Sequence, residues 1–98
     1  MEFVASEFEW DPRKRQSNLA KHGLDFADAP RIFTRQPAIV AARQVGSEDR
    51  YIAVGLLEGL YVAIIYTERD GLIRVISMRR ARRDEQRAYE RKDSPLHN

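Results

Sequence analysis

The pattern of hydrophobic and polar residues changes near Ala38. From this residue onward, β-branched and aromatic residues come in runs that turn residues interrupt, which is typical of strands. Before it, capping residues delimit short helical segments, and beyond Arg80 an arginine-rich segment has the character of a helix. The pattern therefore predicts helices first, then a sheet, then one more helix.

Capping residues predict two helices before the sheet. The Asp11–Pro12 pair is typical of an N-cap followed by proline at the first helical position, and Gly23 suits a left-handed stop. We therefore expect a helix from about Pro12 to His22. A second short helix should begin after Asp25, whose carboxylate can cap it. Pro30 should bend or break that helix, because proline lacks the N–H that the helix needs.

Two glycine-containing pairs divide the apolar region into strands. Glu58-Gly59 and Asp70-Gly71 lie between apolar runs, where a two-residue hairpin needs residues with positive φ. Three antiparallel strands result, and Phe8–Trp10 could add one short strand. Two-residue turns would pair Leu57 with Leu60 and Arg69 with Leu72.

This register sorts the apolar residues onto two faces of the sheet. One face is the better candidate for the core. The other is too apolar to be left in water, so helices or a partner protein should cover it. The expected core face carries Ile52, Val54, Leu56, Tyr61, Ala63, Ile65, Leu72, Ile76 and Met78, and the other carries Tyr51, Ala53, Val62, Ile64, Tyr66, Ile73 and Val75.

The last predicted helix carries a stripe of arginines. Arg83, Arg87 and Arg91 recur at i, i+4 and i+8. Each like-charge pair at this spacing should cost roughly 0.2 to 0.5 kcal/mol, so helix stability cannot explain the stripe. We expect these arginines to meet RNA, an acidic partner protein or solvent. A mildly apolar face that could dock on the sheet consists of Ala81, Glu85, Ala88 and Tyr89.

These elements predict one α+β domain over residues 1–98, with N-terminal helices, an antiparallel sheet of three to four strands and a C-terminal helix. Residues 93–98 are expected to form a frayed tail. Cysteine is absent and the two histidines lie far apart, so we expect no metal site and no cofactor. No signal-like segment and no apolar run of roughly 20 residues is present, which favours a cytoplasmic protein.

Positive charge is concentrated near the C-terminus. From Arg69 onward, nine Lys or Arg residues face five Asp or Glu residues, whereas the earlier part has eight against ten. Arginine suits phosphate because its planar fork grips two oxygens and stays charged at any working pH. The asymmetry indicates a small protein that handles RNA or DNA.

Several blocks of residues share a characteristic order and spacing between Phe8 and Tyr89. They are Phe8–Asp11, Asn18 with Lys21–Gly23, Phe26–Phe33, Tyr66–Arg69 leading to Arg74–Ser77, and Arg79–Ala81 with Glu85 and Tyr89. In this order they resemble the BrnT family of bacterial type II toxins. The chain departs from the family pattern at Met78, Pro30 and Arg82, which bears on the start of the last helix.

The resemblance implies a toxin with a fold similar to that of the RelE toxins. Its activity would be that of an endoribonuclease that cleaves RNA without a metal and inhibits translation and growth. It also implies neutralisation by a BrnA-like antitoxin that carries a ribbon-helix-helix module, in an assembly of two toxins and two antitoxins. Operator DNA would then be contacted only through the antitoxin, and no membrane is involved.

Metal-free RNA cleavage needs a proton acceptor, a proton donor and cations for the developing charge. Arg79 and Arg80 are candidate catalytic cations at the end of the last strand. Because side chains alternate along a strand, both can address one phosphate only if the strand ends there. The alternative is that one of them packs its stem over apolar surface and pairs with a carboxylate.

The general acid and base cannot be assigned from the sequence. His22 is the natural candidate for the base, and a helix C-cap or a buried hydrogen-bonding histidine is its alternative role. Glu68 could also act as a base, or form a salt bridge at the end of a strand. Lys21 is a candidate RNA contact; it shares a polar stripe with Lys14 and Asn18, and its alternative is a solvated surface lysine.

Two further arginines are candidates for RNA contacts. In the predicted register, Arg50, Thr67 and Arg74 lie side by side on one face of the sheet. The two arginines would repel one another unless an anion or a carboxylate lies between them. RNA could supply the anion. The alternative carboxylates are Glu68, Asp49 and Asp25.

Two other classes of protein remain open. A DNA-binding module would place the arginine-rich helix in the major groove, yet this helix lacks the Asn and Gln clusters typical of base reading. A non-enzymatic subunit would bind only the antitoxin and would not need Arg79 and Arg80. The favoured interpretation is a ribonuclease toxin that meets its antitoxin through Arg83, Arg87 and Arg91.

Overall fold

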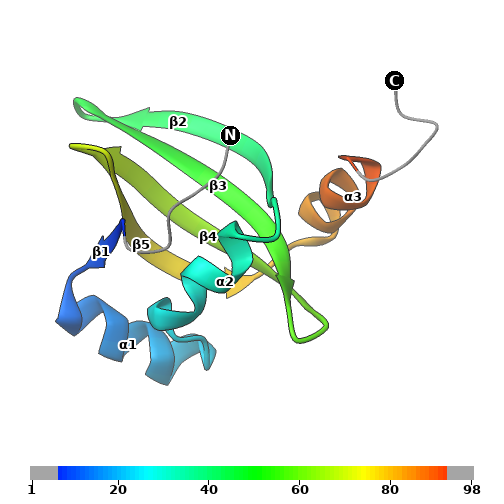
Figure 1. The fold of residues 1–98 in the computed structure, drawn as a ribbon, viewed down its shortest axis with the longest axis horizontal. Helices are drawn as coiled ribbons and strands as arrows, with labels where there is room; N and C mark the ends of the chain where they lie inside the picture. Colours follow the sequence, from blue (N-terminus) through cyan, green and yellow to red (C-terminus); the bar gives the residue numbers. More distant parts are fainter. Residues whose placement is uncertain (1–6, 93–98) are drawn as a thin grey trace.

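A five-stranded sheet with helices packed against it makes up the computed structural model, which describes residues 7–92 (Figure 1). Residues 93–98, the predicted frayed tail, lie outside the described residues. None of the helices in the described part has the length and apolar character that a bilayer crossing requires. In chain order the elements are β1 (Phe8–Trp10), α1 (Pro12–His22), the 3-10 helix η1 (Phe26–Asp28), α2 (Ala29–Phe33), β2 (Ala38–Val45), β3 (Glu48–Leu57), β4 (Leu60–Arg69), β5 (Leu72–Arg80) and α3 (Arg83–Lys92).

Helix α1 begins and ends at the predicted residues. The Asp11 side chain accepts a hydrogen bond from the Arg13 N–H at 2.8 Å, which satisfies a backbone donor of the first turn. Gly23 adopts φ +70° and donates its N–H to the Leu19 carbonyl oxygen at 2.8 Å. Local capping chemistry therefore fixes both ends of this helix.

The second predicted helix is split at the expected proline. Asp25 accepts a hydrogen bond from the Ala27 N–H at 3.0 Å and starts the single turn η1. Helix α2 then begins at Ala29, with Pro30 in its first turn. At that position the missing N–H has no intrahelical partner to lose, so the break falls just before the proline.

The sheet has more strands than predicted and is mixed. The strand order is β1-β5-β4-β3-β2, with β1 parallel to β5 and the other neighbours antiparallel. The three predicted antiparallel strands and the short strand Phe8–Trp10 are confirmed, but the sheet has a fifth strand and β1 is parallel to β5, so the predicted strand number and the all-antiparallel order are wrong. The prediction left out β2 as an edge strand, because the alanines and polar residues of Ala41–Gln44 carry little β-propensity.

Both predicted hairpin turns are confirmed. Glu58 and Gly59 adopt φ values of 50° and 84°, and Asp70 and Gly71 adopt 54° and 80°. Positive φ at both central positions matches the right-handed twist of the flanking strands. The resulting register pairs Leu57 with Leu60 and Arg69 with Leu72, as predicted.

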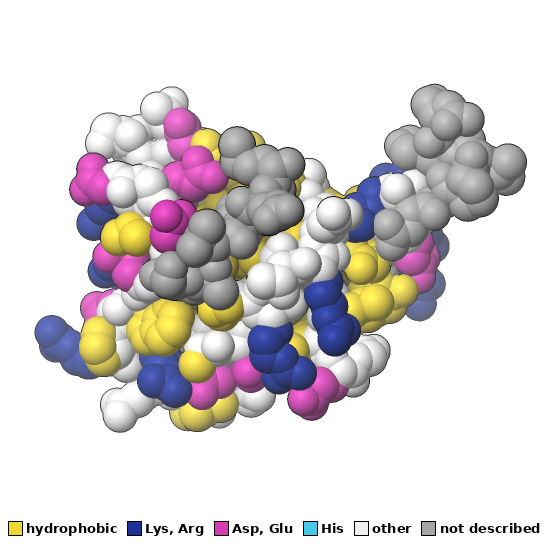
Figure 2. All heavy atoms as spheres, viewed as in Figure 1, with side chains coloured by type: hydrophobic (Ala, Val, Ile, Leu, Met, Phe, Trp, Pro, Cys, Tyr) yellow, Lys and Arg dark blue, Asp and Glu magenta, His cyan; other side chains and the backbone are white. Residues whose placement is uncertain are grey.

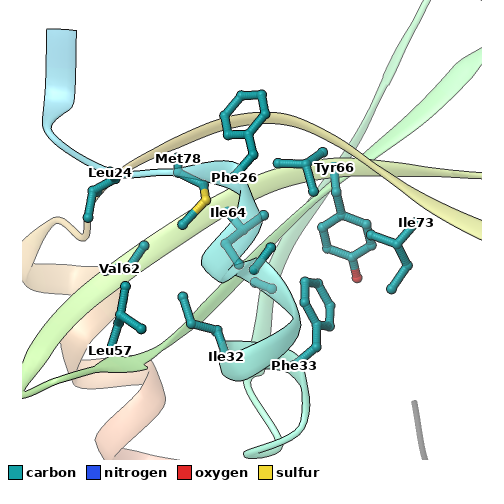
Figure 3. Packing of buried hydrophobic residues seen from close by; sticks show 13 residues of the cluster. Leu24, Phe26, Ile32, Phe33, Leu57, Val62, Ile64, Tyr66, Ile73 and Met78 are labelled. Carbon is teal, nitrogen blue, oxygen red and sulfur yellow. The ribbon is translucent and has the colours of Figure 1, made fainter. Parts of the chain in front are cut away.

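The main core lies on the face that the sequence analysis ranks second. Phe26, Ile32 and Phe33, from η1 and α2, are buried there against the sheet (Figure 3). We call this side the helical face. The helices approach it closely, since a Cβ added to Gly55 would lie 2.6 Å from Cγ2 of Ile32. The sheet contributes Ala53, Leu57, Val62, Ile64, Tyr66, Ile73, Val75 and Met78.

A bulge at Ile76 explains why Met78 belongs to this core. The pairs Tyr66–Val75 and Ile65–Ser77 leave Ile76 without a direct partner on β4. One extra residue moves every following side chain to the other face, so Met78 points to the helical face and not to the predicted one. The same shift decides the directions of the two arginines that follow.

Helix α3 covers one end of the opposite face. Its buried residues Glu85 and Tyr89 face the sheet, as predicted for the docking side of this helix. The helix lacks a Ser or Thr cap, but Glu85 accepts a hydrogen bond from the Arg82 N–H at 2.8 Å. This contact is half of a capping box and needs no hydroxyl at Arg82. The small cluster beneath the helix consists of Ala38, Val54, Ala63, Ala81 and Tyr89.

Candidate functional site

A row of directly paired residues crosses the whole sheet on the face opposite the main core. Residues paired across neighbouring strands point to the same side, so the row forms one surface. The predicted part, Arg50–Thr67–Arg74, is confirmed, and Arg43 of β2 extends it. In strand order the row reads Arg43, Arg50, Thr67, Arg74 and Glu9. We call this side, with Arg43, Arg50, Arg74 and Arg79, the arginine face.

Two arginines of the row have carboxylate partners that differ from the predicted ones. Arg50 Nε donates to Glu48 Oε2 at 2.9 Å, and Arg74 Nη1 lies 3.4 Å from Glu9 Oε2. The alternative neutralisers proposed from the sequence, among them Asp25, are therefore wrong. All four side chains keep about 30% of their surface exposed, so each pair contributes at most about 1 kcal/mol. A phosphate could displace such weak partners.

Arg43 differs from its neighbours in the row. Its side chain is exposed, and within residues 7–92 it has no hydrogen bond or ion pair. The sequence analysis missed Arg43, because it follows from pairing β2 with β3 and not from any motif. The signal that could have found it is the run Ile39–Val40 ahead of a turn at Gly46.

Arg79 is held by helix α3. Its Nη1 and Nη2 donate to the two carboxylate oxygens of Glu85 at 2.8 and 2.9 Å, and Nη1 also donates to the Arg80 carbonyl oxygen at 3.2 Å. The predicted alternative, an arginine paired with a carboxylate, is therefore confirmed for this residue. The bonds leave Nε–H and one Nη2–H, which point the same way, without a partner among the described residues.

The electrostatic surroundings of Glu85 suit a carboxylate that holds Arg79 in place and not one that transfers protons. Hydrogen bonds from Arg79 lower the pKa of Glu85 against the opposing effect of burial, and the Arg82 N–H lowers it further. A carboxylate with a lowered pKa is a weak base near neutral pH. Glu85 is therefore a positioning residue, which the sequence analysis assigned only to the docking face of α3.

Arg80 leaves the same strand on the other side. It pairs with Val62 of the helical face, whereas Arg79 pairs with Ala63 of the arginine face. Strand β5 ends at Arg80, which is the condition for both guanidiniums to reach one phosphate. The Arg80 side chain is exposed and has no partner within the described part of the chain.

Helix α1 brings two more candidates toward Arg80. The helix follows Trp10, which pairs with Val75, and Asn18 bonds to Met78 further along β5. It therefore runs in the direction of β5. Its last two residues, Lys21 and His22, are exposed and lie toward the end of the sheet where β5 stops. No described hydrogen bond or ion pair joins either of them to an arginine.

Asn18 does not belong to a solvated stripe with Lys14 and Lys21. It is buried and bonds to both the N–H and the carbonyl oxygen of Met78, at 3.1 and 3.0 Å. These atoms lie on the edge of β5 beyond the last β1 pair, so the amide takes the place of a missing strand. Asn18 also donates to the Leu24 carbonyl oxygen at 3.1 Å.

Glu68 lies apart from these arginines. It pairs with Ile73, so it points to the side opposite Arg50 and Arg74. Its side chain is exposed, and within residues 7–92 it forms no ion pair, which leaves the predicted salt bridge without support. The structure therefore separates this candidate base from the arginine face.

The three arginines of the α3 stripe are exposed, as predicted. Among the described residues none of Arg83, Arg87 and Arg91 has an ion pair.

On the side of the molecule shown in Figure 2, which includes α2, basic and acidic side chains are interspersed and form no single cationic patch. Within residues 7–92, no three His, Cys, Asp or Glu side chains lie close enough together to hold a metal ion.

Taken with the fold, these residues define a small α+β protein that presents arginines on an open sheet face. A comparison with protein families identifies it further: residues 10–85 match the family described as "Ribonuclease toxin, BrnT, of type II toxin-antitoxin system". The match covers more than half of the chain, which therefore belongs to the BrnT family of ribonuclease toxins. Comparison with curated proteins and with solved structures gave no significant match. A type II system pairs its toxin with a protein antitoxin.

Proposed function

We propose that this protein is a metal-independent endoribonuclease that inhibits translation and growth when it is free of its antitoxin, and that its fold is RelE-like. The cross-sheet row of Arg43, Arg50 and Arg74 is the observation that carries the proposal. Cations spaced along an open face suit a polymer with regularly spaced phosphates. Family membership supplies the ribonuclease class.

In this proposal, cleavage takes place at the end of β5. The ribose 2′-oxygen gives its proton to a base and forms a bond to phosphorus. The bond from phosphorus to the 5′-oxygen breaks, and the leaving 5′-oxygen takes up a proton from an acid or from water. The free Nε–Nη2 edge of Arg79 binds the charged phosphate oxygens, and Arg80 approaches from the other side of the sheet. Glu85 holds Arg79 in place, so the guanidinium does not have to reorganise as charge develops.

Proton transfer is assigned to the same end of the sheet. His22 is the candidate base, because α1 carries it toward Arg80 and its ring is exposed. Lys21 beside it is a candidate phosphate contact. Arg80 also lines a hollow of about 320 Å³ with Tyr61 and Gln86, which gives a ribose or base room next to the phosphate. Glu68 is the weaker candidate, because it pairs with Ile73 near the start of β5, whereas the proposed site lies where β5 ends.

The antitoxin side of the proposal rests on the exposed stripe of α3. A BrnA-like antitoxin with carboxylates could pair with Arg83, Arg87 and Arg91, which have no partners among the described residues. We propose an assembly of two toxins and two antitoxins, in which the antitoxins form the two-fold DNA-binding unit. The toxin itself would not contact operator bases.

The test is to incubate the antitoxin-free chain with single-stranded RNA and with duplex DNA, each with and without millimolar EDTA. We expect cleavage of RNA only, unchanged by EDTA, because guanidinium groups can stabilise the charge. Arg80→Ala should lower cleavage about 100-fold, whereas Arg35→Ala, the same charge removed beside α2, should have no effect. Both side chains are exposed, so neither change should unfold the protein.

Each alternative gives a different result. Loss of cleavage on chelation, with recovery on adding magnesium, would overturn the metal-free mechanism. Tight binding of duplex DNA without RNA cleavage would indicate a DNA-binding module. A chain that binds its antitoxin but neither nucleic acid would be a non-enzymatic subunit.

A further inference from the structure

The arginine face contains a hollow that the proposed cleavage chemistry does not use. It measures about 280 Å³ and lies beside the cross-sheet row, away from the end covered by α3. Its apolar lining comes from three neighbouring strands, and two arginines of the row border it. The lining residues are Ala41, Ala42, Arg43, Val45, Arg50, Tyr51, Ile52 and Ile65.

The floor of the hollow is the row of residues next to the arginine row. Ala41, Ile52 and Ile65 are paired across β2, β3 and β4, so their side chains share the arginine face. One row further along, Val54 and Ala63 are fully buried beneath α3. The helix therefore stops short of this floor, where Ile52 and Ile65 stay partly exposed.

The border of the hollow differs from an ordinary apolar surface. The Arg43 side chain has no partner within the described residues, and Arg50 has one carboxylate partner, the half-buried Glu48, which also pairs with Arg69. An apolar floor beside an uncompensated guanidinium matches the two parts of a nucleotide, a flat base and a phosphate. An apolar protein side chain could fill the same space, but it would leave Arg43 without an anion.

We propose that this hollow receives one base of a single-stranded RNA while Arg43 binds a phosphate next to that base. The proposal rests on the ribonuclease function proposed above and adds a second contact point along the same strand of RNA. The base packs on Ile52 and Ile65, and Ala41 leaves the room for it. A nucleotide held here would set which bond of the RNA reaches Arg79, so the hollow is a specificity site.

The test measures binding of a short single-stranded 2′-O-methyl oligonucleotide, which cannot be cleaved through its 2′-oxygen. A series of such probes, each with one abasic position, is compared with the parent. We expect one abasic position to weaken binding about tenfold, which corresponds to the packing of one base. Ala41→Leu should fill the hollow and weaken binding of the parent oligonucleotide about tenfold. In this variant, removing the base at the critical position should cause no further loss of affinity.

Two matched controls separate the hollow from general effects on the strand. Gln44→Leu adds a similar apolar side chain to the same exposed edge strand, on the side facing away from the hollow, and should leave both affinities unchanged. Arg43→Ala should reduce the salt dependence of binding by roughly 0.7 in the log–log slope, the effect of one phosphate contact. Arg35→Ala should leave that slope unchanged.

The outcomes distinguish this proposal from the function on which it rests. Equal binding of all abasic probes, or an unchanged affinity of Ala41→Leu, would overturn the base site while leaving the ribonuclease proposal standing. If Ala41→Leu binds RNA normally but no longer binds the antitoxin, the hollow would be assigned to the protein partner. A wild-type chain that binds no RNA at all would overturn both proposals.

Discussion

The two faces of the sheet are used in opposite ways. On the helical face, η1 and α2 bury Phe26, Ile32 and Phe33 so completely that at most 1% of each residue stays exposed. On the arginine face, α3 covers only one end, and the remainder carries a row of charged residues and an open hollow. The chain therefore completes one face by itself and leaves the other for something else.

The difference between the faces separates residues that the stability of the fold requires from residues that it does not require. Residues of the helical face have their positions fixed by packing, and close approach is visible even at Gly55. Arg43, Arg50 and Arg74 of the open face are held by weak, partly exposed ion pairs or by none, which contribute little to stability. Arg79 is the exception, because its ion pair with Glu85 is mostly buried. Charged side chains that the fold does not need are the best candidates for function.

The largest expected effect is on the helical face. Phe26→Ala should lower the free energy of unfolding by about 3 to 5 kcal/mol, because it removes a fully buried ring and leaves a cavity. Urea denaturation would measure this. Arg43→Ala on the open face should change stability by less than about 0.5 kcal/mol. Similar losses for the two variants would show that the faces are not divided in this way.

The second prediction concerns the arginine that α3 holds. Arg79→Ala would leave the buried Glu85 carboxylate without its ion-pair partner, with only the Arg82 N–H bonded to it. This costs about 3 to 5 kcal/mol, so a loss of activity could not be told apart from a loss of folded protein. Arg79→Lys keeps a cation next to Glu85 but removes the second edge of the guanidinium. We expect a folded protein whose RNA cleavage falls about 100-fold, since an ammonium cannot grip two phosphate oxygens.

Single-turnover cleavage assays and thermal melts would measure both parts of this prediction. The matched control is Arg31→Lys, the same change at an arginine whose exposed partners, Asp28 and Glu58, lie away from the arginine face. It should leave cleavage unchanged. A fully active Arg79→Lys would remove the free guanidinium edge from the mechanism.

Local chemistry explains why much of the fold could be predicted from the sequence. The caps of α1 and the two hairpin turns depend on residues adjacent in the chain, such as Asp11, Gly23 and Gly71. The bulge at Ile76 depends on how β5 meets β4, and no residue type in the sequence marks it. The sequence analysis missed this bulge and therefore assigned Met78 to the wrong face. One extra residue in a strand reverses the face of every side chain that follows it.

The candidate site could likewise be predicted only where it depends on local features of the chain. The alignment of Arg50 with Arg74 follows from the two hairpin turns, so it could be predicted from the sequence. Arg43 and Glu85 could not be, because one depends on the pairing of an edge strand and the other on the docking of a helix. Contacts between distant elements are fixed by packing and leave no local signature.

The third prediction sharpens the division between folding and function at Asn18. Asn18→Ala should lower the free energy of unfolding by about 2 kcal/mol, because the Met78 N–H and carbonyl oxygen lose their partner on the edge of β5. Ser17→Ala, next to it on the exposed side of α1, should have almost no effect. Cleavage per folded molecule should stay normal in both variants. A loss of cleavage beyond the unfolded fraction would place Asn18 among the functional residues.

The smallest effect is expected at the arginine stripe of α3, the proposed contact with the antitoxin. Reversing Arg83 and Arg87 together to Glu should weaken the complex by roughly 1 kcal/mol at low salt, because rim charges mainly steer association and are screened. The fold should tolerate the change, because both side chains are exposed and position 83 lies in the first turn of α3, where an acidic residue is favourable. Reversing Arg13 and Arg35, which are exposed elsewhere, changes the net charge equally and is the control. Light scattering and titration of the purified complex would measure both pairs. If affinity at low salt is unchanged, the stripe on α3 meets RNA or solvent, and the antitoxin binds another part of the open face.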